Sequence, residues 1–288
     1  MWALAVYNDL LFSGSSDAAI KVWETRAATG FKCKKTMRRH DGIIHCMVVD
    51  NGKLYSGSSD RTIIVWDINT SEVLDTLRGH DNPVCTISIA NGMLFTGSLK
   101  CVRVWDIYSH ELLGEICELN HWVRALTATP EFIYAGSYQT ISVWSSKRAG
   151  PGGLQEAFDK GEEPRVLQTL STSGGSVYSL CVTDKLILCG TFEHLVHVWD
   201  VNTFQELYTL EGHEGTVYSL AVMAQPTTAR PLLFSASYDK SIKVWDLESF
   251  ECLQTLRRHE NSANAIAVQR NWLFSGAADN TVKVWSQD

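Results

Sequence analysis

The amino-acid sequence predicts an all-β, seven-bladed propeller, and two observations lead to that prediction. Seven of the ten tryptophans close a segment of alternating apolar residues, and their successive separations are 43, 39, 39, 55, 46 and 40 residues. A repeat of about 40 to 45 residues that ends in such a strand is typical of a propeller blade. These tryptophans are Trp23, Trp66, Trp105, Trp144, Trp199, Trp245 and Trp285.

The segment before each tryptophan is itself repeated. It reads LFSGSSDAAIKVWE at 11–24, LYSGSSDRTIIVWD at 54–67 and LFSASYDKSIKVWD at 233–246. Turn residues divide each repeat into four short strands, which bury both faces only when repeats stack on one another. We expect one domain with blades at approximately 1–39, 40–78, 79–118, 119–171, 172–211, 212–257 and 258–288. The expected inner strands are 2–6, 43–49, 84–89, 122–127, 177–182, 217–222 and 263–268.

Three irregularities accompany the repeat. The segment 146–163, rich in glycine, is expected to be a flexible, disordered insertion that explains the separation of 55 residues. A second insertion at 223–231 explains the separation of 46, and propeller connectivity places both insertions at the lower end of the blades. The last blade is expected to lack its outer strand in this chain. That strand would lie upstream of Met1 and leave residues 281–285 as an exposed edge.

The composition limits the classes of function. With 45% apolar and 20% charged residues the chain is globular, and its net charge of −7 gives no overall attraction for nucleic acid or anionic membranes. No apolar run is long enough for a membrane span, and Asn8 and Asp9 interrupt any signal peptide. The eight cysteines form no Cys-x-x-Cys pair, which favours reduced thiols and a cytoplasmic or nuclear protein. We expect a monomeric propeller with protein partners, no nucleic acid and no membrane insertion.

Histidine, serine and aspartate recur at fixed distances from the tryptophans, and these are also the residues of a hydrolase site. A catalytic site is built once, whereas a structural hydrogen-bond network recurs in every repeat. We therefore predict a structural role, no catalytic residue and no cofactor. Complete sets are His40, Ser56, Asp60 and Trp66; His213, Ser235, Asp239 and Trp245; and His259, Ser275, Asp279 and Trp285. Blade one has Ser13, Asp17 and Trp23 without a histidine.

Two further clusters are weak candidates. His194 and His197 lie on one expected strand, but no third ligand is evident, so no metal site is predicted. The basic run at 32–39 alternates along an expected outer strand and fits a solvated edge.

Blades three to five depart from the pattern. Blade three has His80 and Thr96 but a turn one residue short and no aspartate, and blade four has Ala135 in the serine position. Blade five has Glu193 in the aspartate position and Ser173 in the histidine position. Relaxed structural constraint explains this contiguous sector, and so does use of these turns by a partner.

With these motifs the chain resembles the WD40-repeat family over its whole length. The resemblance implies that in each set the indole N–H bonds to serine, serine to histidine and histidine to a buried aspartate. The segments NPVCTISI, LNHWVRALTA and CGTFEHLVHVWD are similar to the C-terminal propeller of a RING-type ubiquitin ligase of the tumour-necrosis-factor-receptor-associated factor family.

That similarity implies a non-catalytic scaffold that recruits protein partners, the first candidate being a MAP kinase kinase kinase. Ubiquitin transfer would belong to a RING upstream of this chain. The alternative is an F-box-type receptor for a phosphorylated degron. Such a receptor would present several arginines on the upper face of the propeller, where Arg124 alone is expected.

Propeller geometry predicts which side chains reach this upper face. They are the residue after the first apolar residue of each inner strand and the residue before the turn aspartate. Tyrosine, tryptophan and arginine dominate interface hot spots, so we predict partner binding there. The alternative interpretation is that these rings fill the mouth of the central channel as core. The candidate residues are Trp2, His45, Arg124, Tyr138, Tyr178, Phe192, Tyr218, Tyr238 and Asn264, with Trp122 close by.

Overall fold

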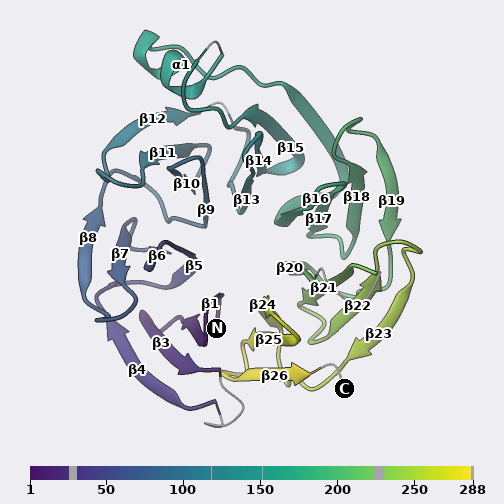
Figure 1. The fold of residues 1–288 in the computed structure, drawn as a ribbon. Coiled ribbons are helices and arrows are strands. Elements are labelled where there is room, and N and C mark those ends of the chain that lie inside the picture. The colour runs from purple at the N-terminus through teal and green to yellow at the C-terminus, as the bar shows by residue number, and fades with distance from the viewer. Residues whose placement is uncertain (26–30, 118, 151, 224–229, 287–288) are drawn as a thin grey trace. The chain divides into compact units, whose positions relative to one another are not determined.

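A computed structural model describes residues 1–25, 31–117, 119–150, 152–223 and 230–286. The chain comprises two compact units. One unit combines residues 1–39 with 178–288, and the other consists of residues 40–177. Each unit is built from antiparallel sheets in which neighbouring strands follow one another along the chain (Figure 1). We call each repeat a blade and number the blades one to seven in chain order.

The unit of residues 40–177 contains blades two, three and four. Blade two consists of β5 (Ile44–Asp50), β6 (Lys53–Ser58), β7 (Ile63–Asp67) and β8 (Val73–Leu77). Blade three consists of β9 (Thr86–Ala90), β10 (Met93–Gly97), β11 (Val102–Asp106) and β12 (Leu112–Ile116). Blade four consists of β13 (Ala125–Ala128), β14 (Phe132–Gly136), β15 (Tyr138–Ser145) and the first part of β16 (Gln168–Val182).

The unit of residues 1–39 and 178–288 contains the other blades. Blade one consists of β1 (Ala3–Tyr7), β2 (Leu10–Gly14), β3 (Ala19–Glu24) and β4 (Cys33–Arg38). Blade five consists of the second part of β16 with β17 (Leu186–Thr191), β18 (Val196–Asp200) and β19 (Glu206–Leu210). Blade six consists of β20 (Val217–Met223), β21 (Leu232–Ser237), β22 (Ile242–Asp246) and β23 (Cys252–Leu256). Blade seven consists of β24 (Ala263–Gln269), β25 (Trp272–Ala277) and β26 (Val282–Ser286).

The tight turns follow from the local sequence. Between the first and second strands of blades two and three stand Asn51-Gly52 and Asn91-Gly92, and all four residues have positive φ. A two-residue hairpin turn of this type requires positive φ at both positions, which asparagine and glycine tolerate best. At the connection between the third and fourth strands of blade three, Asp106 accepts the backbone N–H groups of the residues two and three positions later, at 2.7 and 2.8 Å. These hydrogen bonds lower the pKa of Asp106 to about 2.

The core lies between neighbouring blades. Tyr55, Ile63 and Val65 of blade two pack with Ile87 and Trp105 of blade three, and all are less than 9% exposed. Corresponding clusters join blades three and four, five and six, and six and seven. Stacking thus buries the second face of each sheet, at about 1.5–3 kcal/mol for each large apolar side chain.

A glycine at the end of the second strand permits this close packing. A Cβ on Gly57 would lie 2.7 Å from Val84 Cγ1, and one on Gly190 would lie 2.7 Å from Val217 Cγ1. Where the next blade places a valine here, the glycine that precedes the turn is therefore required; in blade six Ala236 takes the position and the next blade begins with Ala263.

The expected disordered insertion at 146–163 is corrected by the structure, which contains helix α1 (Leu154–Lys160) there. Leu154 is 2% exposed and belongs to the core between blades three and four. Phe158, one turn later, packs over Gly114 of β12, where a Cβ would lie 2.4 Å from its ring. The spacing of these two apolar residues gives the insertion a buried face. The second expected insertion, at 223–231, falls largely outside the described residues.

Blades four and five are joined differently from the expectation of two separate strands. β16 runs without interruption from the outer position of blade four, where Ile141 pairs with Leu170, into the inner position of blade five. Ser173 stands where other blades have the histidine that fastens a loop to the next turn. The chain here continues directly in an extended conformation.

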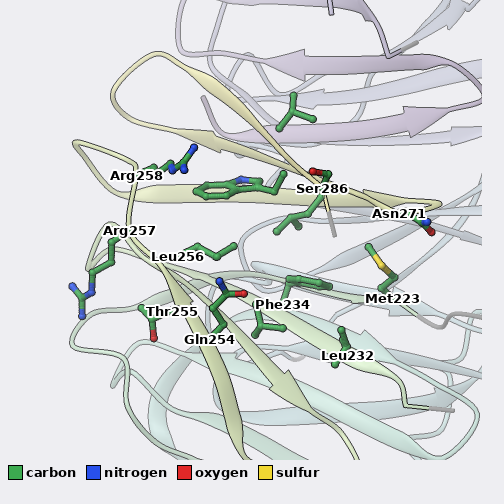
Figure 2. A pocket seen from close by; sticks show the side chains of 14 residues that line it. Met223, Leu232, Phe234, Gln254, Thr255, Leu256, Arg257, Arg258, Asn271 and Ser286 are labelled. Atoms are coloured by element: carbon green, nitrogen blue, oxygen red, sulfur yellow. The ribbon is translucent and has the colours of Figure 1, made fainter. Parts of the chain in front are cut away.

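Within the described residues, blade seven has three strands, and no strand pairs with the outer edge of β26. A groove of about 680 Å³ lies between β23 and β26. Its lining combines apolar side chains such as Phe234, Leu256 and Trp285 with polar ones such as Gln254, Arg257 and Arg258 (Figure 2). Trp285 and its neighbours on β26 are only half-buried, whereas the equivalent strand of blade six is fully buried.

These sheets and their repeated register confirm the predicted fold class, an all-β fold of the propeller type with a last blade of three strands in this chain.

Candidate functional site

Three blades contain the same hydrogen-bonded set of four side chains. In blade two, Trp66 Nε1 donates to Ser56 Oγ at 2.9 Å, and His40 Nε2 lies 2.8 Å from the same oxygen. His40 Nδ1 lies 2.7 Å from a carboxylate oxygen of Asp60. In blades six and seven all the corresponding distances are 2.7 or 2.8 Å. The sets are His213, Ser235, Asp239 and Trp245, and His259, Ser275, Asp279 and Trp285.

The aspartate of each set is ionised. Burial alone would raise the pKa of Asp60, but hydrogen bonds from His40, Thr62 and the backbone N–H of Asp41 outweigh burial and hold this pKa well below its usual range. The same balance lowers the pKa of the aspartates in blades six and seven. The carboxylate therefore accepts the Nδ1 proton of the histidine, and Nε2 accepts the serine hydroxyl proton.

This arrangement resembles a catalytic triad in composition only. The serines of all three sets are 0% exposed, and each hydroxyl oxygen already accepts an indole proton. A nucleophile must reach its substrate, and these oxygens cannot. The sets fasten the turn between the second and third strands to the loop that enters the blade.

Blades three and four retain part of the network. In blade three, Trp105 Nε1 donates to Thr96 Oγ1 at 2.9 Å, and His80 Nε2 lies 2.7 Å from that oxygen. In blade four, Ala135 has no hydroxyl to offer, and the buried Trp144 Nε1 has no hydrogen-bond partner within the described part of the chain.

Blade five replaces the network altogether. Cys189 occupies the serine position and is 0% exposed, and burial raises the pKa of its thiol. His197 stacks on Trp199 and bonds through Nδ1 to Glu206 at 2.6 Å. Glu193, which stands in the aspartate position, is exposed. His197 is thus part of the blade, whereas its sequence neighbour His194 is exposed in a turn.

Five of the ten predicted partner-binding residues form one aromatic cluster in the unit of residues 1–39 and 178–288. The ring of Tyr218 lies 5.4 Å from Tyr178, 6.5 Å from Trp2 and 6.4 Å from Tyr238, and Phe192 stacks on Tyr178 at 6.4 Å. Trp2 is 40%, Phe192 54% and Tyr238 61% exposed. The cluster therefore presents large apolar area to solvent at the same end of the sheets as the turns between second and third strands.

Four candidates lie in the unit of residues 40–177. The guanidinium of Arg124 lies 5.7 Å from the ring of Trp122, and Tyr138, which is 47% exposed, lies 6.0 Å from His121. Burial, together with the charge of Arg124, lowers the pKa of His45. His45 is therefore neutral beside a fixed positive charge.

One predicted residue does not fit this surface, and another was missed. Asn264 is 5% exposed and donates to the carbonyl of Met1 at 3.0 Å, because blade seven and the start of β1 enclose it. Asn120 was not predicted, although it receives hydrogen bonds from Ser137 Oγ and Tyr138 N and so positions Tyr138. It stands three residues before the apolar residue Val123, one position later than the histidines of other blades, and that offset hid it.

Among the described residues, no three histidine, cysteine, aspartate or glutamate side chains are grouped to hold a metal ion. Within the same ranges, no helix has the length and apolarity that crossing a membrane requires. All eight cysteines are free thiols. Of the basic run, Lys34 pairs with Glu24 at 3.3 Å and Arg38 with Asp17 at 3.4 Å on the solvated strand β4.

Comparison with known proteins agrees with this geometry. The WD40 family (WD domain, G-beta repeat) matches residues 31–67, 71–106, 204–246 and 250–286. The chain belongs to the WD40 family. The unmatched WD40 repeats of this chain include blades four and five, which lack the complete network.

Two curated relatives of this WD40 chain are the E3 ubiquitin-protein ligases TRAF7 of Mus musculus and Homo sapiens. Each is 50% identical over 99% of the chain, which covers 46% and 40% of their respective lengths. The chain thus spans less than half the length of these relatives. A solved structure of the computationally designed Ika8 protein aligns with a TM-score of 0.73 at 24% identity, over 99% of this chain and 95% of that one, and shows the fold alone.

Proposed function

We propose that this WD40 domain is a non-catalytic protein-recognition module that recruits partners to a RING-type ubiquitin ligase. The similarity to TRAF7, an E3 ubiquitin-protein ligase, supports the connection with ubiquitin transfer. In this proposal the transfer itself belongs to a RING elsewhere in the protein. The partner is a kinase at the head of a mitogen-activated cascade.

One observation supports protein recognition above all: the exposed aromatic cluster of Trp2, Tyr178, Phe192, Tyr218 and Tyr238. Exposed, contiguous apolar area of this kind is uncommon on a monomer and marks interaction sites. Aromatic rings with a polar atom bury much area at low entropic cost, which makes them frequent hot spots. Rings that only filled the core would not be 54% and 61% exposed, as Phe192 and Tyr238 are.

Alanine substitutions in the complete protein test this proposal. Tyr178→Ala, Tyr218→Ala and, in the other unit, Arg124→Ala should each weaken binding of the captured partner by about 1–3 kcal/mol, with unchanged far-UV circular dichroism. Tyr108→Ala is the matched control, because Tyr108 is 73% exposed but lies at the opposite end of its blade, in the turn between β11 and β12. Affinity capture with mass spectrometry identifies the partner, and titration calorimetry measures its affinity. Loss of binding in Tyr108→Ala with normal binding by the other variants would refute the assignment.

A further inference from the structure

Blade three has a pocket where blades two, six and seven have a carboxylate. The pocket has a volume of about 410 Å³ and is lined by residues that include His80, Asp81, Lys100 and Arg103. It lies wholly in the unit of residues 40–177.

In each complete set one carboxylate oxygen of the turn aspartate accepts two hydrogen bonds. In blade two these come from His40 Nδ1 at 2.7 Å and from the backbone N–H of Asp41 at 3.0 Å. The residues after the histidines of blades six and seven, Glu214 and Glu260, donate in the same way at 3.0 Å. The histidine and the residue that follows it are thus a pair of donors built for one oxyanion.

Blade three keeps this donor pair without the acceptor. Its turn is one residue shorter: Ser98 N bonds to Cys101 O, whereas Ser58 N bonds to Thr62 O in blade two. Leu99 precedes the left-handed residue of the turn, the position that Asp60 has in blade two. Within the described residues, neither His80 Nδ1 nor the backbone N–H of Asp81 has an acceptor.

The histidine ring is nevertheless held as in the complete sets. His80 is 6% exposed, and its ring lies 6.4 Å from Trp105, the same distance as His213 from Trp245. Burial, reinforced by the charge of Arg103, lowers the pKa of His80 to about 3, so the ring is neutral. With Nε2 accepting the Thr96 hydroxyl proton at 2.7 Å, as in the complete sets, the single ring proton is on Nδ1, and His80 is one of the residues that line the pocket.

Positive charge also borders the pocket. Arg103 bonds through Nε to Glu115 at 2.8 Å, and its Nη1 is buried without a hydrogen-bond partner in the described structure. Lys100 is exposed at the rim. Burial raises the pKa of Cys101 to about 11, so this thiol contributes no competing anion.

We propose that the pocket beside His80 binds a carboxylate side chain of a protein partner, which completes the blade-three network from outside. Two neutral donors, with the charges of Arg103 and Lys100 nearby, match a singly charged oxyanion. A phosphate dianion fits less well, because Asp81 and Glu115 already place two carboxylates at the pocket. The inference rests on the proposed protein-recognition function only in assigning the carboxylate to a protein.

Acetate is the probe for the pocket itself. In the full chain, NMR signals of the His80 ring and the Asp81 amide are followed as sodium acetate replaces sodium chloride at constant ionic strength. We expect a saturable shift of the Asp81 amide and an increase of the His80 pKa by about 1–3 units, because an opposite charge comes within hydrogen-bond distance. His40 and Asp41 serve as the internal control, since Asp60 already occupies their site. Inorganic phosphate, in a parallel titration, should produce the smaller response.

A turn graft supplies the carboxylate from within. Residues 98–101 are replaced by the sequence Ser-Ser-Asp-Arg-Thr of residues 58–62, and the same graft with asparagine in place of aspartate is the control. The aspartate graft should abolish the acetate response and lower the affinity for the partner about tenfold. The asparagine graft should retain part of the acetate response and part of the affinity. An absent acetate response, or one that survives the aspartate graft, overturns the proposal. So does equal partner affinity of graft and wild type, in which case protein recognition itself still stands.

Discussion

Trp144 of blade four, whose indole N–H has no hydrogen-bond partner in the described structure, allows the contribution of one hydrogen bond of the network to stability to be measured. Ala135 pairs with Ser142 across β14 and β15, just as Ser56 pairs with Ile64 in blade two. A serine at position 135 would therefore place its hydroxyl against Trp144 Nε1. In blade two the equivalent hydroxyl also lies 3.4 Å from the carbonyl of Ile64, so the new hydroxyl has an acceptor for its own proton.

The expected magnitude follows from two opposing effects. A buried N–H without a partner costs about 1–3 kcal/mol, and a net intramolecular hydrogen bond contributes about 0.5–1.5 kcal/mol after the hydroxyl itself is desolvated. We expect Ala135→Ser to stabilise the protein by about 1 kcal/mol and to raise Tm by about 2–4 °C. Differential scanning calorimetry and urea unfolding measure the change.

The reverse substitution in blade two is the matched control. Ser56→Ala removes the partner of Trp66 Nε1 and of His40 Nε2 together, and should destabilise by more than Ala135→Ser stabilises. If Ala135→Ser lowers Tm while Ser56→Ala leaves it unchanged, the indole hydrogen bonds contribute nothing to stability, and the reasoning fails.

Three further predictions concern the same framework. Trp66→Ala should lower the unfolding free energy by about 3–5 kcal/mol, because it leaves a cavity and an unpartnered serine. Asp60→Asn should lower it by less, and equal losses for the two variants in urea unfolding would contradict this prediction. The pKa of the turn aspartates is lower in the folded than in the unfolded chain. The stability that these aspartates contribute is therefore complete above about pH 4 and is lost as the pH falls further. A Tm that does not change between about pH 5 and about pH 2 would contradict this prediction. Replacing residues 286–288 by the sequence of 67–77 should add a strand to β26 and raise Tm, because apolar residues beside the groove become covered. The control is the same extension with proline at the position of Thr76, which cannot donate a hydrogen bond to the neighbouring strand.

Much of the fold could be predicted from the sequence because each repeat contains the local signals for its own strands and turns. The alternating strands, the Asn-Gly turns and the glycine that ends the second strand in most blades are local signals, and the seven tryptophans set the register. The inner strands β20 and β24 begin at the residues expected. Repetition itself allowed the serine, histidine and aspartate sets to be recognised as a network and not as an active site.

What could not be predicted depends on contacts between segments distant in sequence. Helix α1 packs Leu154 and Phe158 on blades three and four, and its local signals, this spacing and the left-handed Gly161 that ends it, stand beside the glycines at 150, 152 and 153 that favour a flexible loop. Asn264 is buried because Met1 covers it from the other end of the chain. The sequence predicted that the side chains of the aromatic cluster reach one face of the propeller, but only the structure shows which rings contact one another.

The departures in blades three to five can now be weighed residue by residue. Under relaxed constraint alone, a histidine that has lost its aspartate no longer ties its loop to the turn, so nothing favours keeping it. Blade five fits that expectation, since Ser173 replaces the histidine and Cys189 the serine. Blade three does not, because His80, Thr96 and Trp105 keep the geometry of a complete set around a missing acceptor. A partner that supplies a carboxylate would complete the set of blade three as Asp60 completes the set of blade two.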